Sequence, residues 1–290
     1  MKTLLVTGAS GFLGWTLCQV AREEWNVWGT TFSHPTSIPG TTEIQIDLKN
    51  FQDLKHLFND LKPAAVIHAA AASKPNYCQT HPEESYLTNV IVSENIAGLC
   101  ADANIPCAFT STDLIFDGLN APYKESDRPC PVNLYGEHKA IAEERMLKTY
   151  PRTAICRLPL MFGLPSPTAE CFLQGFIRAL EGGQSLHLFT DEYRTSVSVT
   201  TAARGLLLAL DRVEGILHLG GKERMSRYEF GRLMAEVLGF PVDKVQPCLQ
   251  RDVPMAAPRP TDVSFDSSKA FALGYEPPSL REELEMLCNE

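Results

Sequence analysis

The sequence predicts an α/β fold built on a doubly wound parallel sheet, with a smaller C-terminal lobe. Short apolar, β-branched runs alternate with helical patterns through the first half of the chain, and this alternation is typical of a parallel sheet with right-handed crossovers. The run 64–70 is an apolar strand, as expected where helices cover both faces of the sheet.

The first element carries a strand, a glycine turn and a helix in that order. Residues 3–7 are an apolar run, Gly8, Gly11 and Gly14 follow, and residues 15–21 are again apolar. Gly8 permits a tight exit from the strand, Gly11 lets the backbone approach a pyrophosphate, and Gly14 lets the helix lie close to the strand. Because the helix N-terminus is partly positive, the segment predicts a Rossmann-type dinucleotide site.

The later elements follow from apolar runs and helical spacing. We expect strands at 27–32, 43–46, 64–70, 107–110 and 153–160, and helices at 51–61, 82–103 and 132–149. Beyond Gly163 we expect a helix at 197–210, a strand at 215–219, a helix at 227–238 and a terminal helix. Residues 1–162 are predicted to form the dinucleotide-binding domain, with 197–221 returning to it. Residues 163–196 and 222–290 are predicted to form a substrate-binding lobe at the carboxyl edge of the sheet.

Composition limits the partners that we expect. The 290-residue chain has a formal net charge of −9, so bulk electrostatics do not favour nucleic acid. No apolar run reaches the roughly 20 residues needed to cross a bilayer, and we expect no secretory signal, because the N-terminal residues read as a strand. Nine cysteines form no C-x-x-C pair, which indicates reduced thiols in a cytoplasmic protein. We find no spacing typical of metal ligands and expect no metal site.

A second group of residues indicates acid–base chemistry. Tyr135 and Lys139 are four residues apart on a predicted helix and so share one face. A phenol has an unperturbed pKa of about 10, and a neighbouring ammonium is expected to lower the pKa of Tyr135. Thr112 follows the strand at 107–110 and places a hydroxyl at the sheet's carboxyl edge. We read His138 as solvated and His68 as packed.

Longer motifs extend these two groups along nearly the whole chain. They are T-G-A-S-G-F-L-G at 7–14, D-L at 47–48, H-A-A-A at 68–71, S-T-D-L-I-F-D-G at 111–118, P-Y-K-E at 122–125, N-L-Y-G-E-H-K at 133–139 and R-P at 259–260. With these motifs the chain resembles extended short-chain dehydrogenase/reductases. It is most similar to dTDP-4-dehydrorhamnose reductases and to the regulatory β subunit of methionine adenosyltransferase.

The resemblance implies a role for each matching residue. The pyrophosphate would lie against Gly8, Gly11, Phe12 and Leu13, the adenine beside Asp47 and Leu48, and the middle of the cofactor between Ala69, Ala70 and Ala71. Thr112, Tyr135 and Lys139 would form the catalytic triad, and Lys139 would also hold the nicotinamide ribose. The implied reaction transfers hydride to a C4 ketone of a nucleotide sugar, with the proton coming from Tyr135.

The end of the second strand bears on the choice of cofactor. Residues 30–34 contain no carboxylate to accept a hydrogen bond from a ribose 2′-hydroxyl. Thr31, Ser33 and His34 are therefore assigned to cofactor binding, and Ser33 and His34 could donate to a 2′-phosphate. We expect NADP(H), with NAD(H) as the alternative.

The residues expected near the substrate agree less well with the reductases. Lys74, Arg194 and Arg259 are the candidate substrate contacts, the two arginines at a diphosphate. The segment 74–79 lacks the V-D-K-A-E pattern of rhamnose-pathway reductases, and Leu160 stands where they tend to carry tryptophan. Two alternatives stay open: a non-catalytic dinucleotide-binding regulator of another enzyme, and an epimerase or dehydratase. Helices at 82–103 and 132–149 could form a homodimer seam.

Overall fold

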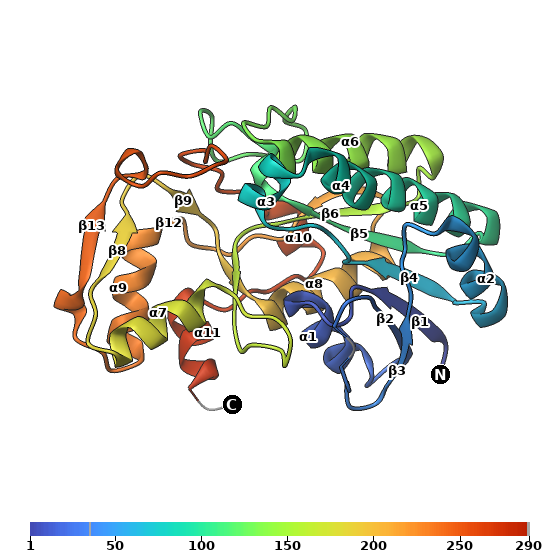
Figure 1. The fold of residues 1–290 in the computed structure, drawn as a ribbon, viewed down its shortest axis with the longest axis horizontal. Coiled ribbons are helices and arrows are strands. Elements are labelled where there is room, and N and C mark those ends of the chain that lie inside the picture. The colour runs from blue at the N-terminus through green and yellow to red at the C-terminus, as the bar shows by residue number, and fades with distance from the viewer. Residues whose placement is uncertain (35, 289–290) are drawn as a thin grey trace.

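A seven-stranded parallel sheet organises the molecule (Figure 1). The computed structural model describes residues 1–34 and 36–288. Neighbouring strands follow the order β11-β6-β5-β4-β1-β2-β3, and every pairing is parallel. The predicted doubly wound sheet is confirmed. Its strands are β1 (Thr3–Thr7), β2 (Asn26–Thr31), β3 (Thr41–Gln45), β4 (Ala65–His68), β5 (Cys107–Thr112), β6 (Ala154–Leu158) and β11 (Gly215–His218).

Helices cover both faces of this sheet, and the alternation of side chains along the strands decides which residues meet them. In β1, Leu4 and Val6 pack with α1 (Phe12–Ala21) and α8 (Val199–Arg212). Leu5 points the other way and packs with α2 (Phe51–Leu61), α5 (Val92–Ala103) and α6 (Leu134–Thr149). This alternation is the two-residue period of a strand with both faces buried.

The long helix predicted at 82–103 is interrupted in its middle. It consists of α4 (Pro82–Tyr86), a π-helical turn η1 (Leu87–Ile91) and α5, and the short α3 (Pro75–Thr80) precedes it. Within the π-helical turn, the Asn89 amide accepts a hydrogen bond from the Ala72 N–H and donates one to the Ala72 carbonyl. π-helical turns recur at functional sites, and this one anchors the loop that follows β4.

The prediction that His138 is solvated is wrong. His138 is buried, its Nδ1 lies 2.8 Å from Ser85 Oγ, and its ring packs edge-on against Tyr86. Helical periodicity places His138 away from Tyr135 and Lys139, but α4 covers that face of α6 as well. The prediction that His68 is packed is confirmed, because it is fully buried between Thr7 and Ser93.

The C-terminal part adds three small two-stranded sheets beside the large one. Their strands pair as β7 (Met161–Phe162) with β10 (Val197–Ser198), β9 (Tyr193–Arg194) with β12 (Met225–Ser226), and β8 (Leu186–Phe189) with β13 (Val245–Cys248). Helices α7 (Phe172–Glu181), α9 (Arg227–Val237) and α11 (Leu280–Leu287) share a core with β8 and β13. Shorter helices are η2 (Asp113–Ile115), η3 (Val242–Lys244), η4 (Gln250–Asp252) and α10 (Ser268–Ala272). None of the helices in the described part of the chain has the length and apolar character required to cross a membrane.

A buried ion pair joins α6 to the sheet. Arg157 in β6 donates to Glu143 in α6 at 2.7 Å, and both side chains are almost inaccessible to solvent. The same guanidinium lies 3.2 Å from His218 Nε2 and over the ring of Phe116. Both partners of a buried ion pair can be replaced by apolar residues with little loss of stability. Removing only one partner leaves the other as an uncompensated buried charge, which is strongly destabilising.

We therefore expect Glu143→Leu to lower the free energy of unfolding by about 3–5 kcal/mol. The double variant Glu143→Leu/Arg157→Met should recover most of that loss, because no lone charge remains in the core. Urea unfolding followed by tryptophan fluorescence measures both. A double variant as unstable as the single one would contradict this account.

Candidate active site

The glycine turn after β1 is held by backbone packing that excludes side chains. Gly8 has a φ of 72°, and a Cβ there would lie 2.7 Å from the Ala70 Cα. A Cβ on Gly14 would lie 2.1 Å from the Gly8 carbonyl oxygen, so α1 approaches the turn as closely as only glycine allows. Gly11 caps α1 without a side-chain hydrogen bond, which leaves N–H groups of the first helical turn to face an anion.

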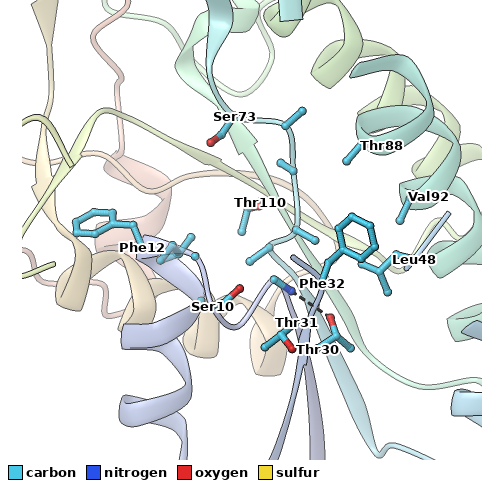
Figure 2. A pocket seen from close by; sticks show the side chains of 18 of the residues that line it. Ser10, Phe12, Thr30, Thr31, Phe32, Leu48, Ser73, Thr88, Val92 and Thr110 are labelled. Carbon is cyan, nitrogen blue, oxygen red and sulfur yellow. Dashed lines mark hydrogen bonds between the residues drawn. The ribbon is translucent and has the colours of Figure 1, made fainter. Parts of the chain in front are cut away.

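A cavity of about 470 Å³ extends from this turn across the carboxyl ends of the central strands (Figure 2). It brings together thirteen of the fourteen residues predicted to contact a cofactor: Gly8, Gly11, Phe12, Leu13, Thr31, Ser33, Asp47, Leu48, Ala69, Ala70, Ala71, Tyr135 and Lys139. The exception, His34, is not among the lining residues; its Nδ1 lies 2.8 Å from Ser33 Oγ on the surface.

The cavity has further lining residues that the sequence did not assign to direct contact with a cofactor. They are Ser10, Gly14, Thr30, Phe32, Ile46, Lys49, Ala72, Ser73, Glu84, Thr88, Val92, Thr110, Ser111, Leu158 and Met161. Figure 2 places the Phe32 ring beside Leu48 and Val92. Lys49 Nζ lies 5.5 Å from the centre of that ring and 3.9 Å from the Asp47 carboxylate. Phe32 directly follows β2 and Lys49 directly follows Asp47-Leu48, and these positions are the sequence signal by which both residues could have been found.

Close packing at the start of α6 aims Tyr135 at the cavity. Asn133 caps the helix by accepting from the Gly136 N–H at 2.9 Å. A Cβ on Gly136 would lie 2.0 Å from the Leu114 carbonyl oxygen, so glycine allows α6 to pack directly on η2. One turn further, Lys139 is 1% exposed and its Nζ lies 3.8 Å from the centre of the Phe109 ring.

The hydroxyls after β5 divide their roles. Thr112 Oγ1 accepts from the Leu114 N–H and donates to Asp113 Oδ1 at 3.2 Å, and Thr112 is not among the residues that line the cavity. Ser111 does line the cavity, and its buried hydroxyl has no hydrogen-bond partner among the described residues. The site therefore offers one hydroxyl that is already bonded and one that is free.

The predicted effect of Lys139 on its neighbour is wrong. Burial raises the pKa of Tyr135 above the usual value for a phenol; Asp113 and Cys78 raise it further, and the contact with Thr112 lowers it. Burial also lowers the pKa of Lys139 to about 7. Desolvation penalises the charged form of each group, and burial is the largest influence on the pKa of both. Tyr135 thus keeps its proton at neutral pH, as a proton donor requires.

The three predicted substrate contacts lie outside the cavity. Lys74 is exposed at the start of α3. Arg194 is buried, with nitrogens 3.2 Å from both the Asp113 and the Glu192 carboxylates. Arg259 donates to the carbonyls of residues 257 and 258 and to the Asn76 side chain. Only the two arginines share a neighbourhood, since the charges of Glu192 and Arg194 act on Arg259.

Gly14→Ala is expected to weaken NADPH binding at least about tenfold, because the new methyl group must displace the phosphate-facing turn. Quenching of protein fluorescence by the nucleotide measures the dissociation constant. Gly175→Ala in α7 is the matched control: its Cβ meets nothing within 4 Å, and binding should not change. Equal affinity in Gly14→Ala and wild type would contradict the close-packed turn.

Lys139→Met should stabilise the protein, and the gain should depend on pH. The pKa of Lys139 is about 7 in the fold and 10.5 as a reference value, so the unfolded chain binds the extra proton between these pH values. The contribution of Lys139 to the free energy of unfolding of the wild type is therefore highest above pH 10.5, where Lys139 is neutral in both the folded and the unfolded state. It falls as the pH is lowered from 10.5 to 7, because the unfolded chain gains a proton that the folded protein does not. The advantage of Lys139→Met over wild type should therefore exceed about 1 kcal/mol at pH 7 and shrink towards pH 10 in urea unfolding. A gain in the free energy of unfolding that does not depend on pH would contradict the lowered pKa of Lys139.

Comparison with known proteins gives one consistent result. The family model described as the RmlD substrate binding domain matches residues 1–290. Methionine adenosyltransferase 2 subunit beta of Xenopus laevis is 30% identical over 284 residues, covering 94% of this chain and 83% of that protein. The probable low-salt glycan biosynthesis reductase Agl14 of Haloferax volcanii is 28% identical, covering 97% and 96%. The structure of dTDP-4-dehydrorhamnose reductase from Bacillus anthracis in complex with NADP has a TM-score of 0.88, with 22% identity and 99% coverage of both chains.

Proposed function

This chain belongs to the RmlD substrate-binding domain family, and we propose that it is an NADPH-dependent reductase of a 4-keto nucleotide sugar. The observation that carries the proposal is the position of Tyr135. It is a buried, protonated phenol that lines the same cavity as the glycine turn, with Lys139 one helical turn away and Thr112 beside it.

The cavity suits a dinucleotide at each of its parts. The turn at Gly8, Gly11, Phe12 and Leu13 would cradle the pyrophosphate, because the backbone there leaves no room for a Cβ at Gly8. Asp47 and Leu48 would flank the adenine opposite Phe32, and Ala69–Ala71 the middle of the cofactor.

Three features favour NADPH over NADH. The end of β2 carries no carboxylate, while Ser33 and Lys49 both line the cavity. A serine hydroxyl and a lysine ammonium suit a 2′-phosphate, which a carboxylate at this position would repel. The NADP complex of the Bacillus anthracis reductase agrees with this preference.

Chemistry at the site needs a hydride and a proton. A nicotinamide cofactor held by the cavity would supply the hydride that the C4 carbon of the keto sugar accepts. Tyr135 gives its phenolic proton to the oxygen at C4, so the ketone becomes an alcohol and the phenolate is left to be reprotonated. Lys139 would hold the nicotinamide ribose, and its ammonium form would stabilise the phenolate. Ser111 has a hydroxyl without a partner among the described residues, which would donate to the ketone, while Thr112 contacts the phenol and would orient it.

A second function, a dinucleotide-binding regulator of another enzyme, is supported by one specific finding. The 30% identity to methionine adenosyltransferase 2 subunit beta extends over most of both chains. An epimerase or dehydratase has less support. Dehydratases of this group usually carry two acidic residues directly after the serine or threonine of the site. Here Leu114 follows Asp113, and the Asp113 carboxylate is paired with Arg194.

Tyr135→Phe is expected to reduce NADPH oxidation about 10²- to 10⁴-fold, because it removes the proton donor and little else. The assay follows absorbance at the NADPH maximum with dTDP-4-keto-6-deoxy sugar as substrate. NADPH affinity should stay within about threefold of wild type, since the phenol contributes its hydroxyl mainly to the reacting oxygen.

The same assay separates the two functions. Turnover by wild type that is lost in Tyr135→Phe supports the reductase. Tight NADPH binding by wild type without turnover, across a panel of 4-keto nucleotide sugars with different bases, would support the regulator instead.

A further inference from the structure

The short helix α3 is bonded to the start of the helix that carries Tyr135. The Leu134 N–H, the first of α6, donates to the Gln79 side-chain oxygen at 3.2 Å. An N–H at this position has no partner within its own helix, and here α3 supplies the acceptor. Asn133 accepts from the Gly136 N–H on the other side of Tyr135. The backbone is therefore held before and after Tyr135, by Gln79 from α3 and by Asn133 from the helix cap.

The residue before Gln79 packs beside the phenol. Cys78 is fully buried and forms a small apolar cluster with Leu114 and Tyr135. Its Sγ donates to the Ala72 carbonyl at 3.1 Å, and Ala72 lines the cavity. Two consecutive residues of α3 thus act on the same group, since Cys78 packs with the Tyr135 side chain and Gln79 holds the backbone next to it.

The other end of α3 is bonded to the C-terminal lobe. The Asn76 side-chain oxygen accepts from the Ala257 N–H and from the Arg259 guanidinium, both at 3.1 Å. Figure 1 shows α3 between the lobe and the helices α4 and α6. Asn76 and Gln79 are three residues apart on one helix, which is less than one helical turn. A single rigid turn therefore joins the lobe to the start of α6.

We propose that α3 positions Tyr135 for proton transfer and makes this position depend on the C-terminal lobe, with Gln79 and Asn76 as the positioning residues. The proposal rests on the proposed function, because it assigns α3 a role in the reaction of Tyr135. Gln79 does not reach the reacting atoms and acts through the first turn of α6. Proton transfer needs the phenol oxygen within about 3.2 Å of the oxygen that it protonates. A small shift of this turn therefore slows the step while every reacting group is still present.

Amide hydrogen exchange on the full chain, followed by NMR, tests the link between α3 and α6 without any substrate. Gln79→Met removes the acceptor and keeps the length of a side chain that is partly exposed. The Leu134 N–H should then exchange about 3- to 10-fold faster, the value of one lost hydrogen bond. Gln79→Glu keeps an acceptor, and a carboxylate suits a helix N-terminus, so exchange should be no faster than in wild type.

A matched control makes the same substitution elsewhere. Gln246→Met changes a residue of β13, where the Gln246 amide donates to the Asp243 carbonyl. The Leu134 N–H should exchange at the wild-type rate in this variant, because β13 belongs to the core of the lobe and not to α3 or α6.

The dependence on the lobe has variants of its own. Asn76→Ala removes both bonds to the segment 257–259 and should also speed exchange of the Leu134 N–H. The effect should be smaller than in Gln79→Met, because the bond from Leu134 to Gln79 is kept. Asn76→Asp keeps an acceptor for both donors, and the exchange rate should return to that of wild type.

Steady-state kinetics in the NADPH oxidation assay test the role in the reaction. Gln79→Met should lower kcat about 3- to 10-fold. The KM for the keto sugar and the Kd for NADPH should stay within about twofold of wild type, as expected when an interaction acts on the transition state alone. Gln79→Glu should restore kcat, which a general loss of stability would not predict.

The outcomes separate the link from the proposed reaction. Exchange of the Leu134 N–H that is unchanged in Gln79→Met, or equally faster in Gln246→Met, would overturn the link. Unchanged exchange in Asn76→Ala would overturn the dependence on the lobe, and unchanged kcat in Gln79→Met would overturn the positioning role. Faster exchange in both α3 variants, with no turnover of any 4-keto sugar by wild type, would support the link and contradict the reductase instead.

Discussion

Burial of one face of α6 is the constraint on which the rest of the structure depends. Tyr135, Lys139 and Glu143 follow one another at four-residue spacing, and all three are buried against the sheet. Polar groups in such a position need partners. Lys139 lies on the Phe109 ring, Glu143 pairs with Arg157, and Tyr135 meets Thr112. Helix α6 therefore carries the reactive groups. The contacts that offset the cost of burying these groups also fix the helix against the sheet.

Burial also sets the protonation states on which the proposed chemistry depends. It keeps the Tyr135 proton in place and brings the pKa of Lys139 to about 7. A phenol that holds its proton at neutral pH can give it up when a stronger base, an alkoxide, forms beside it. A lysine poised near neutrality responds to any negative charge that enters the cavity, because such a charge favours the ammonium form.

The contacts between the C-terminal lobe and the residues that follow the sheet strands lie at the carboxyl edge of the sheet, next to the reactive groups. The Asp113–Arg194 pair joins the end of β5 to β9, and Asn76 and Asn133 bind the segment 257–259. The lobe thus contacts the residues next to Thr112 and Tyr135 directly. A substrate held by the lobe would be placed relative to the reactive groups by these contacts, with a precision that flexible surface side chains do not provide.

The sequence alone determined the sheet, the glycine turn and the positions of Tyr135 and Lys139, because each rests on local geometry: a two-residue or 3.6-residue period, or a glycine that no other residue can replace. The two-residue strands of the lobe are too short to leave a period. The burial of His138, the raised pKa of Tyr135 and the bond from α6 to α3 were decided only by the tertiary structure. Desolvation and hydrogen bonding depend on segments distant in the chain, α4 over His138 and α3 against the start of α6, and no local pattern records which segments will meet.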